Sequence, residues 1–575
     1  MESEFAAQLS AVRPDLSAAY AAALPGARAA VLGRLWRSLL HEPLPGLDAS
    51  HTAHGACGRA GDAASLPPGR REPAQAAPGP PGRREPAQAA PGPPGRREPA
   101  HAAGEPPDGA RQAVVVLSDG RRVAGRARLP YDLGGEPVLW LDDLPCTHPA
   151  ELLAALGVPG AGRLIEDLAN SVASLALSRA SAAAQPRIAA ATPVTYEQSV
   201  VDGHPYHPCC RNRPGVSVAE QLAYMPEHRP VVALDLVAMP AADCLVTGPW
   251  PASLTDGDRL LLPVHPWQTR HVLPGLGLRP YATGAIPAHP LMSVRTLAPL
   301  DGGPHLKTAF TTRMTSDVRD ISPGSIRDCV ALSDLLSDLS ARLDGHPRVA
   351  RYLAGAAAAA KGEPSADLSV MLREPTSAVA GSGTVLPVAA VTREMVRDPA
   401  EWLAAFAHLA LTAALGMLAH GAALEAHGQN LLIVLDGARG LPARLVYRDL
   451  ADIRLSPARL ARSGIEVPPV SPRLLSDDPA VLHAKLFGSL VGTTFGSLIS
   501  VFCAGDRAAE SRLWAVVAAA AREAFGTLPG GPDVRTDRDA LFAPHLTVKA
   551  LLLAQLEGAP PDDSWMKIPN PLHAI

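Results

Sequence analysis

A proline-rich repeat of 13 residues divides this chain and limits what it can fold into. GRREPAQAAPGPP begins at Gly69, recurs at Gly82 and returns in part as GRREPAHAA at Gly95. A short unit with several prolines cannot sustain a helix or bury an apolar face, and so few copies cannot build a solenoid. We therefore predict a disordered, mildly basic insertion at residues 45–110, for which the alternative is a docking segment for a partner.

Outside the repeat, the chain has the composition of a folded, multidomain protein. It has 575 residues, of which 47% are hydrophobic and 19% charged, enough to bury a core and too long for a single one. Its 52 basic and 56 acidic residues give a net charge of −4, which argues against a nucleic-acid coat or a polybasic membrane binder. The 7 scattered cysteines do not resemble a secreted disulfide framework, and no signal peptide is visible. We expect a cytoplasmic protein.

One uncharged stretch, residues 486–505, is long enough to cross a bilayer. Its glycines at 488, 492 and 496 and its several hydroxyl groups dilute the apolar content. We therefore predict a buried helix there, with no membrane partner.

Helical and strand patterns follow one another in blocks. Helices are predicted at 3–40, 148–157, 162–184 and 400–424, and hairpins at the Asp119-Gly120 and Asp436-Gly437 turns. Short β-type runs lie between 195 and 320, and most of the last 200 residues are helical. We expect an N-terminal domain at 1–185, a β-rich domain at 186–365 and a helical domain at 366–575.

A loop at residues 197–217 gathers histidines and arginines between prolines: His204, His207, Arg211 and Arg213. Two arginines disfavour a cation and favour an anion. Zinc is the alternative, because two cysteines follow the histidines, but adjacent cysteines rarely reach one tetrahedral ion together. A purely structural loop is the other alternative.

Two further runs interleave cations with hydroxyl groups. MSVRTLAP carries Ser293, Arg295 and Thr296, and LKTAFTTRMTSDVRD carries Lys307, Thr311, Arg313, Thr315, Ser316 and Arg319. Strand alternation would place Ser293 with Arg295, and Lys307 with Thr311, on common faces. Such groups suit the oxygens of a polyphosphate, although no GxxxxGK[ST] loop is present. The alternative is an edge strand whose charges face water.

The fourth cluster follows the helix predicted at 400–424. EAHGQN supplies Glu425, His427 and Asn430, and YRDLAD beyond the hairpin supplies Asp449. Two carboxylates and an amide oxygen can hold Mg²⁺ against phosphates. The alternative is a core histidine with surface acids.

In this order, GHPYHP(x)₂RxRxG, HPWQ, SxRT, K(x)₇TSxxR and EAHGQN resemble the IucA/IucC family of NRPS-independent siderophore synthetases. The resemblance covers about residues 145–575, and the repeat has no counterpart in it. Many members carry lysine where Arg211 stands. Here the compact charge of an ammonium is replaced by a planar guanidinium with forked donors, while the positive charge is kept.

The resemblance implies a multidomain α+β fold with a hand-like thumb, fingers and palm, the palm being helical and distantly kinase-like, usually in a homodimer. It also implies the reaction: ATP and Mg²⁺ activate a carboxylate as an acyl-adenylate, and an amine or hydroxyl then attacks the acyl carbon. Citrate is the first candidate for the acid. A kinase-like phosphotransferase and a non-catalytic protein that binds citrate-like anions remain as alternatives.

Matched motif by motif, the resemblance also implies roles for the clustered residues. The nucleotide-binding residues would be His204, Ser293, Arg295, Thr296, Lys307, Thr315 and Ser316. The substrate-binding residues would be His207, Arg211, Arg319 and His427, of which Arg319 and His427 would be catalytic. The Mg²⁺ side would be Glu425, Asn430 and Asp449.

Overall fold

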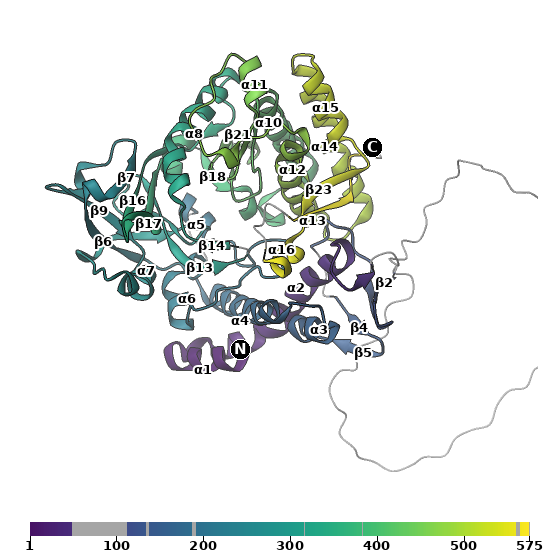
Figure 1. Cartoon of the computed structure of the whole chain (residues 1–575). Coiled ribbons are helices and arrows are strands. Elements are labelled where there is room, and N and C mark those ends of the chain that lie inside the picture. The colour runs from purple at the N-terminus through teal and green to yellow at the C-terminus, as the bar shows by residue number, and fades with distance from the viewer. Residues whose placement is uncertain are drawn as a thin grey trace, which may run out of the picture.

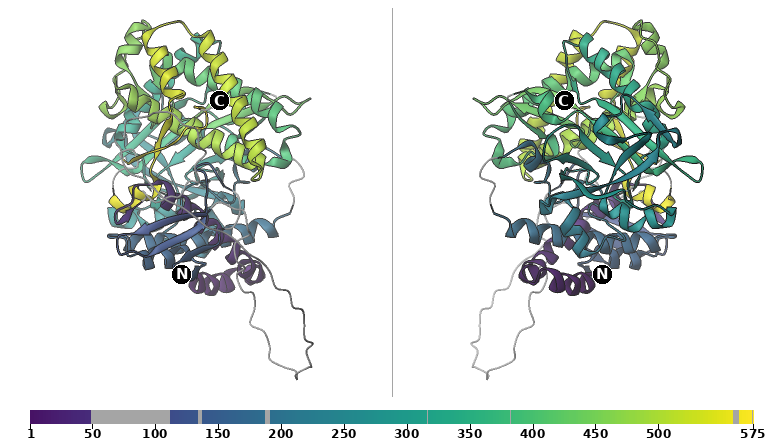
Figure 2. Two further views of the ribbon diagram at one scale, coloured as in Figure 1. Left: turned by 90° about the vertical axis from the view of Figure 1, so that its right-hand side faces the viewer. Right: turned by 90° about the vertical axis from the view of Figure 1, so that its left-hand side faces the viewer.

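The computed structural model describes most of the chain outside the proline-rich repeat (Figures 1 and 2). The described residues are 1–48, 112–133, 137–186, 191–315, 317–381, 383–558, 564–573 and 575. The insertion predicted at 45–110 lies outside them, except for its first four positions.

Helices and a small sheet make up the N-terminal part, which lies at the bottom of Figure 1. Its elements are α1 (Glu2–Val12), α2 (Ser17–His41), β1 (Leu47–Asp48), β2 (Gln112–Leu117), β3 (Arg122–Arg126), β4 (Leu139–Leu141), β5 (Leu144–Cys146), α3 (Pro149–Leu156) and α4 (Gly162–Ala184). The helix predicted at 3–40 is interrupted after Val12, because Pro14 has no amide hydrogen to donate. The hairpin predicted at Asp119-Gly120 is confirmed, and Gly120 takes the positive φ of 89° that its turn requires.

A large antiparallel sheet occupies the left of Figure 1. Its described strands run in the order β7 (Cys244–Thr247), β16 (Tyr352–Ala360), β17 (Glu363–Arg373), β12 (His305–Thr308), β11 (Thr296–Pro299), β10 (Ala282–Pro290), β6 (Val232–Pro240), β9 (Arg259–Val264) and β8 (Thr255–Asp256). The hairpin of β13 (Phe310–Met314) and β14 (Asp317–Arg319) follows β12, and α8 (Pro323–Arg342) packs on the sheet. The predicted boundary at residue 365 falls inside β17, so Arg373 is the better place for it.

The C-terminal part combines helices with a second sheet. That sheet has the order β15 (Arg348–Val349), β21 (Pro442–Tyr447), β20 (Leu431–Leu435) and β18 (Thr384–Pro387), and its β20–β21 hairpin confirms the turn predicted at Asp436-Gly437. The helices are α10 (Pro399–His420), α11 (Pro457–Arg462), α12 (Pro479–Phe487), α13 (Gly496–Cys503), α14 (Arg507–Thr527), α15 (Pro532–Leu541) and α16 (Leu551–Glu557). A π-helical turn at Gly488–Phe495 joins α12 to α13.

Two of the described helices are long and apolar enough to cross a bilayer, α10 and the stretch Pro479–Cys503. Their most apolar windows are 67% and 72% buried inside the protein, which is the pattern of core helices. The buried helix predicted at 486–505 is therefore confirmed as far as Cys503, where α13 ends.

One apolar core joins the two helical parts, and it runs from Phe5 in α1 to Leu572 near the C-terminus. Separate apolar clusters lie in the large sheet. The fold is thus mixed α+β, as predicted, and the seam between the sheet and the joined helical parts is where polar residues collect.

Candidate active site

A cavity of about 400 Å³ lies at this seam and is lined by residues from the N-terminal, sheet and C-terminal parts. The predicted site residues that line it are His204, His207, Arg211, Ser293, Arg295, Lys307, Thr315, Arg319, Glu425, His427, Asn430 and Asp449. Thr296 is buried beside the cavity, where it pairs with Lys307 between β11 and β12. Ser316 lies outside the described residues. Residues predicted from four separate motifs therefore meet at one place.

The predicted strand faces are wrong at this site. Ser293 and Arg295 precede β11 in a tight turn, in which Val294 has a φ of 67°. Lys307 lies on β12, whereas Thr311 lies on the next strand and donates its hydroxyl to Asp367 at 2.6 Å. Short strands separated by turns replace the continuous runs that strand alternation assumed.

The carboxylate of Asp449 is a meeting point for donors of the large sheet. Its Oδ1 accepts from Lys307 Nζ at 2.9 Å, from the Tyr352 hydroxyl at 2.7 Å and from Arg373 at 3.0 Å. Burial raises the pKa of Asp449, but Lys307 and Arg373 outweigh it and hold that pKa well below its usual range. Burial likewise lowers the pKa of Lys307 to about 8, against the opposing pull of Asp449. Asp449 is therefore ionised, and Lys307 loses its proton as the pH rises through about 8.

Two guanidinium groups of the cavity have no carboxylate partner. Arg295 donates to the backbone carbonyls of Arg319 (3.3 Å) and Asp320, and Arg319 donates to that of Met314 at 2.8 Å. Within the described residues, neither forms an ion pair with an acid. Burial lowers the pKa of Arg295 to about 10, and the nearby charge of Arg319 adds to this effect. Cations that line one cavity and form no ion pair with an acid are typical of an anion site.

The histidines of the 197–217 loop are held as neutral rings. His204 Nδ1 accepts from the amides of Tyr206 (3.2 Å) and His207 (3.1 Å), and His207 Nδ1 accepts from that of Cys209 at 2.9 Å. Burial lowers the pKa of His204 well below its usual range and that of His207 to about 3, helped by neighbouring positive groups. No three His, Cys, Asp or Glu side chains gather into a metal site in the described parts of the chain, so nothing supports the zinc alternative.

The guanidinium of Arg211 donates hydrogen bonds to backbone carbonyls of its own loop. Nε donates to the carbonyl of Val201 at 2.8 Å, and Nη2 donates to that of Val200. A lysine has no such pair of parallel donors, which gives the departure from lysine at this position a structural reason. Arg211 lines the cavity, and its hydrogen bonds position the 200–206 segment.

Glu425 lies among cations that sequence reasoning missed. Its Oε1 is 3.0 Å from Lys549 Nζ and 3.5 Å from Lys485 Nζ, and its Oε2 is 3.7 Å from His427 Nε2. Burial raises the pKa of Glu425, but Lys549 and Lys485 outweigh it, so the pKa lies below its usual range. A signal for Lys485 was present: it is a charge inside an otherwise apolar helix, and such a residue is seldom buried unless it is paired.

Glu425, Asp449 and Asn430 each have a side-chain oxygen that is not used in the following hydrogen bonds, and such oxygens suit a hard cation. The lysines use Oε1 of Glu425, and the sheet donors use Oδ1 of Asp449. Asn430 donates its amide to the carbonyl of Glu425 at 3.1 Å, which leaves its own side-chain oxygen free of that bond. Carboxylate and amide oxygens are the kind of ligand that Mg²⁺ prefers, and Glu425, Asn430 and Asp449 all line the cavity.

Backbone strain is concentrated around the cavity. Val294, Thr315 and Asp449 line it, and each has a positive φ, at 67°, 62° and 62°. Such conformations cost roughly 1–3 kcal/mol each and persist only where the surroundings impose them. The π-helical turn at Gly488–Phe495 also borders the cavity, and π turns are frequent at functional sites.

Comparison with known proteins agrees with the sequence resemblance. Residues 192–393 match the model of the IucA / IucC family, and residues 400–561 match that of the ferric iron reductase FhuF-like transporter. Staphyloferrin A synthase of Staphylococcus aureus is 23% identical over 436 residues, which are 66% of this chain and 73% of that protein. D-ornithine–citrate ligase of the same species is 21% identical over 458 residues, which are 66% of this chain and 70% of that protein.

A solved structure has the same fold. ATP-bound aerobactin synthetase IucA of Klebsiella pneumoniae superposes with a TM-score of 0.66 at 19% identity, covering 81% of this chain and 96% of the other. This likeness establishes the mixed α+β fold of the chain.

Proposed function

We propose that this chain, whose residues 192–393 match the IucA / IucC family model, is an ATP-dependent siderophore synthetase. It activates one carboxylate of a polycarboxylic acid, with citrate as the first candidate, as an acyl-adenylate. It then condenses the acyl group with an amine or a hydroxyl to form an amide or an ester. The names of the relatives, a staphyloferrin A synthase, a D-ornithine–citrate ligase and an ATP-bound synthetase, support a ligase, citrate and ATP respectively, whereas the acyl-adenylate rests on the sequence resemblance.

The observation that carries the proposal is the pair of half-buried arginine side chains, Arg295 and Arg319. Neither has a carboxylate partner among the described residues, yet both line the cavity that also holds Lys307 and Glu425. A polyphosphate and a carboxylate brought together need several fixed cations at one place. A cavity for a neutral ligand would leave these charges unpaired.

In the proposed first step, a carboxylate oxygen of the acid attacks the α-phosphorus of ATP and pyrophosphate leaves. Arg295 and Lys307 would hold phosphate oxygens, and Arg319 would hold the acid beside them. Mg²⁺ bound to ATP would offset further phosphate charge, with Glu425, Asn430 and Asp449 as its nearest protein oxygens. These groups act by position and charge, and no covalent enzyme intermediate is required.

In the proposed second step, His427 acts on the acyl group. Its Nδ1 accepts from the amide of Gln429 at 3.3 Å, which places the proton of the neutral ring on Nε2. Burial lowers the pKa of His427, although Glu425 opposes this, so the ring is neutral at pH 7. An Nε2–H donor can polarise the acyl oxygen while the amine attacks and AMP departs.

A screen of acids against amines and alcohols tests the proposal. Release of AMP and pyrophosphate with a citrate-like acid and an amine is the expected result. Release of ADP would favour the kinase-like alternative, and tight citrate binding without ATP turnover would favour the binding protein.

The remaining parts of the proposal concern assembly and place. We propose a cytoplasmic homodimer in which the N-terminal, sheet and C-terminal parts act as thumb, fingers and palm, the palm being distantly kinase-like. Sedimentation of the purified protein checks the dimer, for which a single species of 59.7 kDa would be the contradicting result.

A further inference from the structure

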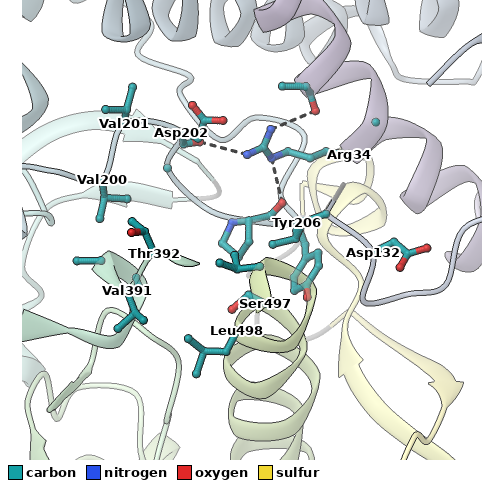
Figure 3. A pocket seen from close by; sticks show the side chains of 18 of the residues that line it. Arg34, Asp132, Val200, Val201, Asp202, Tyr206, Val391, Thr392, Ser497 and Leu498 are labelled. Atoms are coloured by element: carbon teal, nitrogen blue, oxygen red, sulfur yellow. Dashed lines mark hydrogen bonds between the residues drawn. The ribbon is translucent and has the colours of Figure 1, made fainter. Parts of the chain in front are cut away.

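A second cavity, of about 640 Å³, adjoins the candidate active site (Figure 3). Part of the 200–206 segment, together with Arg37, Ala389 and Ser497, lines both cavities. The 200–206 segment is therefore a partition between them, and a molecule in the second cavity lies next to the proposed adenylation site.

The partition is held firmly from both sides. Arg34 of α2 donates to the carbonyls of Asp202 (3.3 Å), His204 (3.2 Å) and Pro205 (3.0 Å), and dashed lines in Figure 3 mark bonds of this arginine. Arg211 holds the carbonyls of Val200 and Val201. At Gly203, with a φ of 72°, a Cβ would lie 2.6 Å from the carbonyl oxygen of Cys210. The division into two adjoining cavities is thus built into the fold.

The second cavity has aliphatic walls and acids that are already paired. Val201, Val391 and Leu498 form part of the walls. Asp202 forms an ion pair with Arg179 at 2.5 Å, and Asp132 forms one with Arg507 at 2.7 Å. Neither acid is left to attract a second cation, so the walls suit an alkyl chain.

Arg37 and Arg34 both line the second cavity without an ion pair in the described parts of the chain, but Arg34 donates to backbone carbonyls, whereas Arg37 keeps one donor unused. The side chain of Arg37 is 4% exposed, and its Nε donates to the carbonyl of Pro130 at 2.6 Å. Its Nη1 has no hydrogen-bond partner in the described parts of the chain, and the guanidinium lies 4.6 Å over the ring of Tyr206. The nearby acid, Glu42, accepts instead from the amides of Leu552 and Leu553 at 2.8 Å each. A buried guanidinium with an unused donor points to an anionic group on the ligand.

The second cavity also reaches the loop of His427. The amide of Ala389, which lines both cavities, donates to the carbonyl of Gly428 at 2.9 Å. The second cavity therefore ends beside the loop that carries His427.

We infer that the second cavity binds the acyl acceptor, an amine on an aliphatic chain that also carries a carboxylate, with Arg37 as the anchor of that carboxylate. This inference rests on the proposed function. In the condensation, the amine nitrogen bonds to the acyl carbon, the acyl–oxygen bond to AMP breaks, AMP leaves with the electron pair, and the amine gives up one proton to water.

Matched amines test the anchor. L-ornithine and 1,4-diaminobutane differ only in the carboxylate, as do L-lysine and 1,5-diaminopentane, and L-2,3-diaminopropionate and ethylenediamine. The parent protein should prefer the carboxylated member of the pair that it condenses fastest. Arg37→Gln should lose this preference, with kcat/KM for the carboxylated amine falling at least tenfold and that for the plain diamine changing less than twofold. Arg37→Lys should restore part of the preference. An equal loss for both members, or a parent that prefers the plain diamine, overturns the anchor.

A substitution that narrows the cavity tests its occupant. Thr392 lines the second cavity and is exposed (Figure 3). Thr392→Trp should raise KM for both amines at least fivefold, whereas Met395→Trp, on the same segment outside the lining, should not. Hydroxylamine is small enough to trap the acyl-adenylate directly, so the formation of acyl hydroxamate should persist in Thr392→Trp. Loss of hydroxamate with unchanged KM for the amines would place the acid in this cavity and overturn the inference.

Failure of the proposed function would look different. A parent protein that forms no hydroxamate from any acid would sink the synthetase proposal itself. Calorimetric binding of L-ornithine and 1,4-diaminobutane to the parent and to Arg37→Gln would still decide the cavity. Tighter binding of L-ornithine that Arg37→Gln abolishes supports the anchor, and equal or absent binding of the two overturns it.

Discussion

Lys307 and Asp449 form an ion pair, Nζ to Oδ1 at 2.9 Å, that joins the large sheet to the C-terminal part beside the cavity. Lys307 comes from β12, and Asp449 follows β21 with a strained φ of 62°. Tyr352 and Arg373, from β16 and β17, bond to the same carboxylate. The Asp449 side chain thus bonds to three residues on the opposite wall of the candidate site.

Asp449→Asn should destabilise the protein markedly. The change leaves Lys307 and Arg373 without their counterion, and breaking a buried pair in this way costs about 3–5 kcal/mol. Urea unfolding measures the loss. Asp452→Asn is the matched control, because Asp452 is 45% exposed and its contact with Arg473 is 3.5 Å, so it should cost less than about 1 kcal/mol. Similar losses in the two variants would contradict the bridging role.

Lys307 should set the alkaline limb of the pH profile. Its pKa of about 8 lies below the ordinary value of 10.5, so the ammonium is charged below pH 8 and loses its proton as the pH rises through that value. kcat/KM for ATP, which reports the free enzyme, should therefore fall above about pH 8. Lys307→Arg should lose this limb, because a guanidinium stays charged. An unchanged limb in Lys307→Arg would assign the titration to another group.

Arg295→Ala should slow the reaction without unfolding the protein. If Arg295 holds a phosphate on which charge develops, its loss should cost about 2–4 kcal/mol of transition-state stabilisation, measured from kcat/KM for ATP. Arg313→Ala is the control from the same motif, because Arg313 forms an ion pair with Asp167 at 2.5 Å instead of lining the cavity. An Arg295→Ala enzyme with parental kcat/KM would remove Arg295 from the phosphate site.

His427 and Asn430 should differ in their response to Mg²⁺. If Asn430 offers an oxygen to the metal, the defect of Asn430→Ala should be partly restored at raised Mg²⁺. His427→Ala should show no such recovery, because added metal cannot replace a hydrogen-bond donor at the acyl group. Pyrophosphate release across a Mg²⁺ titration, beside the parent, makes the comparison. Equal recovery of both variants, or of neither, would mean that their roles are divided wrongly.

Local features of this chain could be predicted from the sequence because they depend on neighbouring residues. The two Asp-Gly turns close their hairpins wherever the chain later packs. Thr311 shows the limit of such reasoning. A break at Ala309 places it on another strand from Lys307, where it bonds to Asp367, and the pattern of residues does not reveal that break.

By itself, the sequence determined which residues were candidates for the site, since charged and hydroxyl groups in short motifs signal anion binding before any fold is known, and most of these candidates line one cavity. Only the tertiary structure decided their partners. Glu425 meets Lys549 from 124 positions away, and Arg448 meets Glu197 from 251 positions away. The tertiary structure also directs the guanidinium of Arg211 to carbonyls of its own loop. It places Arg37, which has no ion pair with an acid in the described parts of the chain, in the lining of the second cavity. The physical reason is that the pairing of buried charges depends on distance in space, which is set by packing of the whole core and not by spacing along the chain.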